Sequence, residues 1–313
     1  MKYLITFLRI IVGSVLVVSG LIKANDSLGF SYKLEEYFEP TALNMPFFMD
    51  YALPIAMIVC IVEVVLGLSL IIGTKYKLTV VLVFLMFVFF GFLTYFTASC
   101  DPNELITYIN SNGESVTEKA QCVLDCGCFG DALHLEPWQS FKKDLILLFL
   151  TIPFFLGFFK QFEVKLNNER KDRVLITGSI LFTMLFAGYI FEWWLPAIFI
   201  AVAAFITIVF KFFYTKKGRE WALIGLASIL TAIFVYVTIT FLPVKDFRAY
   251  AVGNNLPELM KTSEDYKQEI FEAEFDEEMK SYSQTIENEI KKAVSVDLRL
   301  QSDTISEERK AEI

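Results

Sequence analysis

Seven long apolar runs dominate this chain and restrict what it can fold into. They cover residues 4–22, 52–73, 78–98, 144–160, 174–191, 195–213 and 221–242. A helix of about 20 apolar residues matches the thickness of the hydrocarbon core of a bilayer. The composition agrees, because 55% of the residues are hydrophobic and the mean hydropathy is +0.51. We therefore predict an all-α, polytopic membrane protein with about seven transmembrane helices.

Lysine and arginine gather in alternate connections between these runs. The basic connections are residues 74–77, 160–173 and 211–219, whereas the connection at 25–51 carries five acids and one lysine. Because cytoplasmic loops are enriched in lysine and arginine, this pattern predicts a cytoplasmic N-terminus in a bacterial inner membrane. The loop at 99–143 and the tail after Pro243 are then periplasmic.

Four of the five cysteines fall within that one loop, at Cys100, Cys122, Cys126 and Cys128. An exported loop faces an oxidising space, in which disulfides form and persist. Two neighbouring thiols can exchange disulfides, since a second thiol resolves the mixed disulfide formed by the first. Gly127 permits the tight backbone that a Cys126–Cys128 bond requires. We predict that Cys126 and Cys128 are catalytic, with Cys100 and Cys122 as a second pair in a relay.

Other interpretations of these cysteines stay open. A Cys100–Cys122 bond could simply close a polar loop, and four cysteines allow three pairings that sequence cannot distinguish. Zinc with His134 as a further ligand is less favoured, because C-x-C spacing suits one tetrahedral ion poorly; we predict no metal. Cys60, inside the second run, is typical of a small buried apolar side chain.

Ionisable residues within the apolar runs are the second functional signal. Glu63 lies near the middle of the second run, and Lys23 ends the first. Such residues usually face the interior of a helix bundle and mark a site or a proton route. A purely structural carboxylate is the alternative for Glu63. Arg9 lies about one turn inside the first run and could extend to the nearer membrane surface.

Several short motifs occur in a familiar order along the first half of the chain. They are Gly13, Ser19-Gly20, Lys23, Asp26, Phe30, Leu53-Pro54, Glu63, Gly67, Gly73, Cys126-Gly127-Cys128-Phe129-Gly130, Trp138 and Lys143-Asp144. Over about residues 1–160 this set resembles the DoxX-like membrane proteins, and among them the MauE branch associated with disulfide formation in exported proteins. Residues 243–248 and Tyr250 resemble the longer variants of Bacteroidetes-type bacteria.

The resemblance implies a four-helix bundle whose outer end is capped by the cysteine loop. It also implies similarity to membrane thiol oxidases that pass electrons to quinone. A quinone is apolar, resides in the bilayer and needs a polar group that handles protons. Glu63 and Lys23 are the candidate residues for binding such a ligand.

The chain divides by composition into three regions. Residues 1–160 form the four-helix membrane domain, residues 161–243 add three transmembrane helices, and residues 244–313 form an acidic tail with 17 acids and 10 bases. Apolar residues recur in the tail at helical spacing, which predicts an amphipathic helix. This helix is either solvated or a docking element for a partner.

These observations predict a redox-associated membrane protein, specifically a thiol–disulfide oxidoreductase acting with a periplasmic thiol protein and a membrane quinone. The alternative is a non-catalytic subunit or assembly factor of a cell-envelope complex, with structural disulfides and a tail that binds the partner. Solute transport has less support, because no inverted repeat is visible. No nucleic-acid partner is predicted.

Overall fold

The fold is described by a computed structural model that covers residues 2–109, 114–123, 127, 129, 132–133, 135–159, 169–213, 216–241, 243–247 and 284. The chain forms two compact units, residues 1–248 and residues 249–313. The architecture below is that of the first unit.

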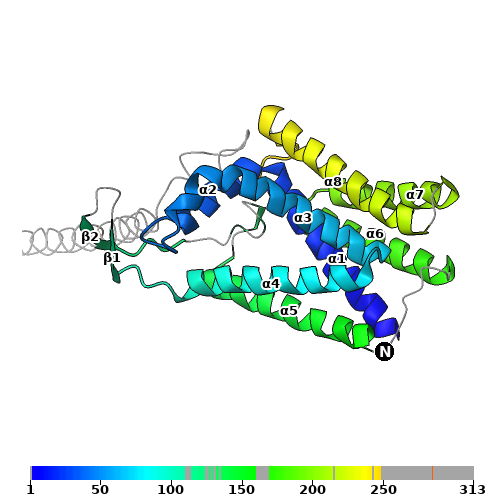
Figure 1. Ribbon diagram of the computed structural model, residues 1–313, viewed down its shortest axis with the longest axis horizontal. Coiled ribbons are helices and arrows are strands. Elements are labelled where there is room, and N and C mark those ends of the chain that lie inside the picture. Colours follow the sequence, from blue (N-terminus) through cyan, green and yellow to red (C-terminus); the bar gives the residue numbers. More distant parts are fainter. Residues whose placement is uncertain are drawn as a thin grey trace, which may run out of the picture. The chain divides into compact units, whose positions relative to one another are not determined.

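Helices make up most of this unit (Figure 1). The predicted connection at 25–51 holds a short helix and one 3-10 helix, and the loop at 99–143 holds an antiparallel hairpin. In chain order the elements are α1 (Lys2–Asn25), α2 (Ser27–Phe38), η1 (Pro46–Tyr51), α3 (Ala52–Ile72), α4 (Tyr76–Ser99), β1 (Leu105–Ile109), β2 (Ser115–Lys119), α5 (Pro137–Phe159), α6 (Glu169–Ile190), α7 (Leu195–Phe213) and α8 (Lys216–Phe241).

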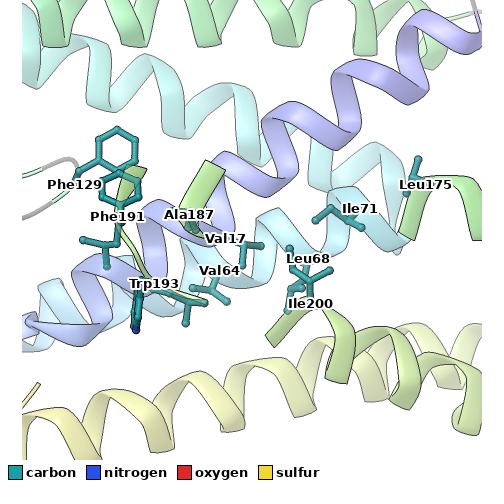
Figure 2. Packing of buried hydrophobic residues seen from close by; sticks show 13 residues of the cluster. Val17, Val64, Leu68, Ile71, Phe129, Leu175, Ala187, Phe191, Trp193 and Ile200 are labelled. Carbon is teal, nitrogen blue, oxygen red and sulfur yellow. The ribbon is translucent and has the colours of Figure 1, made fainter. Parts of the chain in front are cut away.

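The antiparallel pair α1 and α3 forms the centre of the unit. Glycines let the two backbones approach closely, as small residues do between membrane helices. A Cβ on Gly67 would lie 2.9 Å from the carbonyl oxygen of Gly13, and one on Gly20 would lie 3.0 Å from the backbone nitrogen of Val64. Val17 and Val64 pack beside this seam with Leu68 and Ile71 (Figure 2).

The remaining helices pack around this pair. Helix α5 lies along α4, α6 packs against α1, and α8 packs against α3, so all of them belong to one body. Side chains join their ends. The Asn25 side chain accepts a hydrogen bond from the Val244 backbone and donates to the Lys245 carbonyl, which brings the ends of α1 and α8 together. We call this the loop end of the unit.

At the other end, the turn between α3 and α4 meets the last turns of α5 and the first turn of α8. Tyr76 donates to the Phe154 carbonyl at 3.4 Å, and Lys75 lies 3.6 Å from Glu220. The turn carries the predicted basic connection at 74–77. We call this the basic end.

Four of the described helical segments are long and apolar enough to cross a membrane: Tyr3–Asn25, Pro46–Ile72, Tyr76–Ser99 and Gly218–Phe241. By length and composition, these segments support a helical membrane protein. Shorter apolar stretches occur at Val174–Ile190 and Leu195–Phe210. In the part of the chain that the structure describes, the predicted total of seven spans is therefore not confirmed.

Three helices begin earlier than their apolar runs predict. Helix α5 begins at Pro137, α6 at Glu169 and α8 at Lys216, five to seven residues before the predicted runs at 144, 174 and 221. Polar first turns extend these helices beyond the apolar segment. Proline suits the first position of α5, because a backbone N–H there would have no hydrogen-bond partner within the helix. Hydropathy does not detect such polar turns, so it placed the starts too late.

Candidate functional site

Lys23 and Glu63 form an ion pair inside the α1–α3 interface. The Lys23 ammonium donates to Glu63 Oε2 at 2.6 Å and to the Ser19 hydroxyl at 3.2 Å. The two side chains are only 1% and 2% exposed. Sequence reasoning singled out both residues as ligand-binding candidates, and the structure brings them together although they lie 40 residues apart.

Aromatic rings face the Lys23 ammonium in addition to its hydrogen-bond partners. Its Nζ lies 4.4 Å from the centre of the Phe90 ring and 5.6 Å from that of Phe30. A cation over a ring face is stabilised by the ring quadrupole, more strongly where water is excluded. This arrangement supports a charged lysine in an otherwise apolar region.

A second ion pair lies near the start of α5. Lys143 Nζ is 3.1 Å from Asp144 Oδ1 and 4.9 Å from the centre of the Phe129 ring. Asp144 is 3% exposed, so its carboxylate is as enclosed as that of Glu63. Sequence reasoning counted these two residues only among the motifs of the family resemblance. Adjacent opposite charges at the edge of an apolar run were the signal that could have identified them.

Both ion pairs line one cavity with about 260 Å³ of empty space. Its wall combines residues of α1, α3, α4 and α5 with Phe129 from the cysteine loop. The lining residues are Val15, Leu16, Ser19, Lys23, Glu63, Phe87, Phe90, Phe129, Lys143, Asp144 and Leu147. The cavity therefore brings charged donors and acceptors together with aromatic rings in an otherwise apolar region.

Two residues of the CGCFG stretch connect the loop to the helices. Gly127 has a φ of 62°, and a Cβ there would lie 3.4 Å from the Phe30 ring and 3.6 Å from Lys33, both on α2. Phe129 is 6% exposed and packs near Phe191, the residue after α6, with ring centres 5.6 Å apart (Figure 2). Because φ in this region suits glycine, a side chain at position 127 would strain the backbone.

Three of the five cysteines lie in the part of the chain that the structure describes, and two of these three form a disulfide. Cys100 and Cys122 form a disulfide with Cα atoms 5.6 Å apart, joining the end of α4 to the residues after β2. Cys60 is a free, buried thiol in α3, which confirms the sequence interpretation. Cys126, Cys128 and His134 lie outside the described residues. Within the described ranges no group of three or more potential metal ligands occurs.

Arg9 is a buried charge at the opposite end of the same helix pair. Its guanidinium donates to the carbonyls of Leu70 and Ile71 at 2.9 and 3.3 Å, and the side chain is 4% exposed. Carbonyls in the last turn of a helix lack partners within the helix. Arg9 therefore caps α3 and does not extend to the membrane surface as its position had suggested.

Comparison with known proteins gives one match. Residues 1–101 match the family model described as methylamine utilisation protein MauE. The match supports the MauE-type resemblance for α1 to α4, including Lys23 and Glu63. It ends before Cys122, the CGCFG stretch and α5, so the second ion pair lies beyond it. No curated protein and no solved structure matches the chain.

Proposed function

We propose that this chain is a membrane thiol–disulfide oxidoreductase whose electrons leave through a lipid-soluble quinone. The observation that carries the proposal is the cavity lined by the Lys23–Glu63 and Lys143–Asp144 ion pairs and by Phe129, a residue of the CGCFG stretch. A redox reaction that moves protons in an apolar region needs polar groups there, and charged residues within membrane segments usually mark such sites.

The proposed reaction begins at the cysteine loop. With Cys100 and Cys122 joined, Cys126 and Cys128 are the two cysteines of that loop left to pair with each other. A thiolate of a reduced partner protein attacks one sulfur of a Cys126–Cys128 disulfide, and the second thiol of the partner then resolves the mixed disulfide. The partner leaves oxidised, while Cys126 and Cys128 have gained two electrons and two protons.

Re-forming the Cys126–Cys128 bond releases the same two electrons and two protons. A quinone bound in the cavity would accept both and leave as the quinol. The lining supplies the chemistry that such a head group would need: the Lys23 ammonium can donate to a carbonyl oxygen, and Phe87 and Phe90 offer apolar walls. Glu63 and Asp144 can hold a proton beside that oxygen.

The proposal includes a topology. Seven helices, α1 and α3 to α8, cross a bacterial inner membrane with the basic end in the cytoplasm, so that the loop end faces the periplasm. The charge pattern supports this orientation, and so does the position of the 74–77 turn at the end opposite Asn25 and Lys245. Within this unit, α1 and α3 to α5 make the DoxX-like bundle, to which α6 to α8 are added.

The redox state of the two cysteines tests the enzyme proposal. Thiols are trapped by rapid alkylation in native membranes, and the labelled peptides are quantified by mass spectrometry. We expect Cys126 and Cys128 to be disulfide-bonded in quinone-containing membranes, reduced after quinone depletion, and oxidised again when quinone is restored. The matched control is Cys60→Ser, which removes the buried thiol of α3 and should change none of these states. If Cys126 and Cys128 stay reduced and inert in every membrane, the proposal fails.

A non-catalytic role is the second candidate, and the Cys100–Cys122 bond favours it. This bond encloses the β1–β2 hairpin and resembles a structural cross-link. In that case the acidic tail would bind a protein of the cell envelope. Residues up to Phe247 should be kept in a truncated variant, because Lys245 bonds to the Phe191 carbonyl and Phe247 contacts Trp193.

Deletion of residues 249–313 separates the two roles. A binding subunit would lose its partners in a pull-down from cross-linked membranes, and its cysteines would show no dependence on quinone. The oxidoreductase would keep quinone-dependent oxidation of Cys126 and Cys128 after the deletion.

A further inference from the structure

A second cavity lies between α3, α7 and α8 and is open on one side; about 470 Å³ within it and at its mouth is free of protein atoms. It is separate from the cavity lined by the two ion pairs, since the two cavities share no lining residue. On α8 its wall extends from Leu223 to Leu230, a length of roughly 10 Å at 1.5 Å per residue. Most of the wall is aliphatic: the lining residues are Leu68, Ser69, Ile72, Thr74, Phe199, Val202, Ala203, Ile206, Leu223, Ile224, Leu226, Ala227 and Leu230.

One polar atom in this wall lacks a partner. Thr74 is 2% exposed, and its Oγ1 makes no hydrogen bond to any residue that the structure describes. Buried hydroxyls are nearly always hydrogen-bonded, because losing water without gaining a partner is unfavourable. The Thr74 hydroxyl is therefore a candidate donor to a ligand in this cavity.

The chain next to Thr74 is basic. Lys75 has a φ of 42°, its Nζ lies 3.6 Å from Glu220, and it also lies 5.1 Å from the centre of the Trp221 ring. Lys77 and Arg219 add positive charge within the same two segments, against the single acid Glu220. Basic residues at the ends of membrane helices attract anionic head groups, and tryptophan is common at that depth.

We propose that this cavity binds an anionic phospholipid. One acyl chain occupies the aliphatic space, the Thr74 hydroxyl donates to an ester carbonyl, and the phosphate lies near the basic residues of the α3–α4 turn and of α8. Along the site, the apolar wall is followed by the Thr74 hydroxyl and then by the cations. This order matches that of the acyl chain, the ester and the phosphate in such a lipid. The proposal does not depend on the redox function.

Lipid retention by the full-length protein tests this proposal. The purified chain is exchanged into mixed micelles that contain phosphatidylglycerol or phosphatidylcholine with identical acyl chains, and bound lipid is counted by native mass spectrometry. We expect preferential retention of phosphatidylglycerol and a higher unfolding temperature with it. Ala203→Trp should abolish both effects by filling the cavity. Ala201→Trp, on the exposed side of the same helix, is the matched control and should retain both.

Thr74→Val tests the proposed hydrogen bond separately, because it removes the hydroxyl but leaves the shape of the cavity nearly unchanged. It should weaken retention of phosphatidylglycerol about fivefold, the loss of one net hydrogen bond. Without lipid it should leave the unfolding temperature unchanged or raise it, because the hydroxyl has no partner within the described chain.

Four results would overturn the proposal. They are equal retention of the two phospholipids, full retention by Ala203→Trp, unchanged retention by Thr74→Val, and purification with a neutral quinone in place of the phospholipid.

Discussion

The α1–α3 pair carries a buried charge at each end, and the two ends are built differently. At the basic end, Arg9 donates to two carbonyls of the last turn of α3. At the loop end, Lys23 meets the carboxylate of Glu63 beside a cavity that holds a second ion pair. A cation bonded to helix carbonyls completes a helix end. An ion pair beside open space is available to a ligand, so of these two buried cations Lys23 is the one placed to contact one.

The largest expected effect comes from breaking the pair at the loop end. Glu63→Leu leaves the Lys23 ammonium buried without its carboxylate, which should lower the free energy of unfolding by about 3–5 kcal/mol. Combining it with Lys23→Met removes both charges and should restore most of that loss. Thermal unfolding in detergent measures both variants.

The double variant also separates stability from function. We expect it to fold but to lose quinone-dependent oxidation of Cys126 and Cys128. If the double variant keeps wild-type thiol oxidation, the Lys23–Glu63 pair is purely structural. If the double variant is no more stable than Glu63→Leu, the shape of the two side chains, and not their charge, determines stability.

The basic end should respond in stability alone. Arg9→Met removes the charged donor from the Leu70 and Ile71 carbonyls and should lower the free energy of unfolding by about 1.5–3 kcal/mol. Arg9→Lys keeps the charge but loses the planar fork of donors, so an intermediate loss is expected. Thiol oxidation per folded molecule should not change. If it falls at unchanged stability, the contrast between the two ends is wrong.

The seam between the two ends offers a test of backbone approach. In Gly67→Ala the new Cβ would lie 2.9 Å from the Gly13 carbonyl oxygen and from the Val17 backbone nitrogen, so the helices must separate. Overpacking of this kind costs about 1–3 kcal/mol. Gly91→Ala in α4 is the matched control, because no atom lies within 4 Å of its new methyl group. Equal unfolding temperatures for the two variants would contradict the close seam.

The smallest effect concerns Glu39, between α2 and η1. Burial, and then the nearby Glu36, raise the pKa of its carboxyl above the ordinary value of 4.5. The folded state then holds this proton more tightly than the unfolded state. The contribution is therefore favourable at low pH and is lost as the pH rises from 4.5 through the higher folded pKa. Glu39→Gln should remove that slope from the pH dependence of the unfolding temperature, and an unchanged slope would contradict this origin.

The sequence predicted the helices well because hydropathy is a local property. The first three apolar runs correspond to α1, α3 and α4, each among the four candidate spans. It failed where polar residues form regular structure outside those runs. The amphipathic α2 and the β1–β2 hairpin lie in segments that we expected only as polar connections.

The candidate site was predictable only in part for a related reason. Lys23 and Glu63 were identifiable because charges in apolar runs are unfavourable and therefore conspicuous. Lys143 and Asp144 were overlooked as ligands because they stand at the boundary of an apolar run, where charges are ordinary. Only the structure shows that Asp144 is buried and that the Lys143 ammonium lies 4.9 Å from the centre of the Phe129 ring.

By itself, the sequence determined the class of protein, the apolar helices, the alternation of basic connections and the gathering of four cysteines in one loop. Each of these can be read along the chain without knowing which distant segments pack together. Only the tertiary structure decided which charges meet, since Lys23 pairs with Glu63, and Arg9 with α3, across 40 to 62 residues. Such pairings depend on how closely α1 and α3 approach through their glycines, and that geometry is a property of the packed helices.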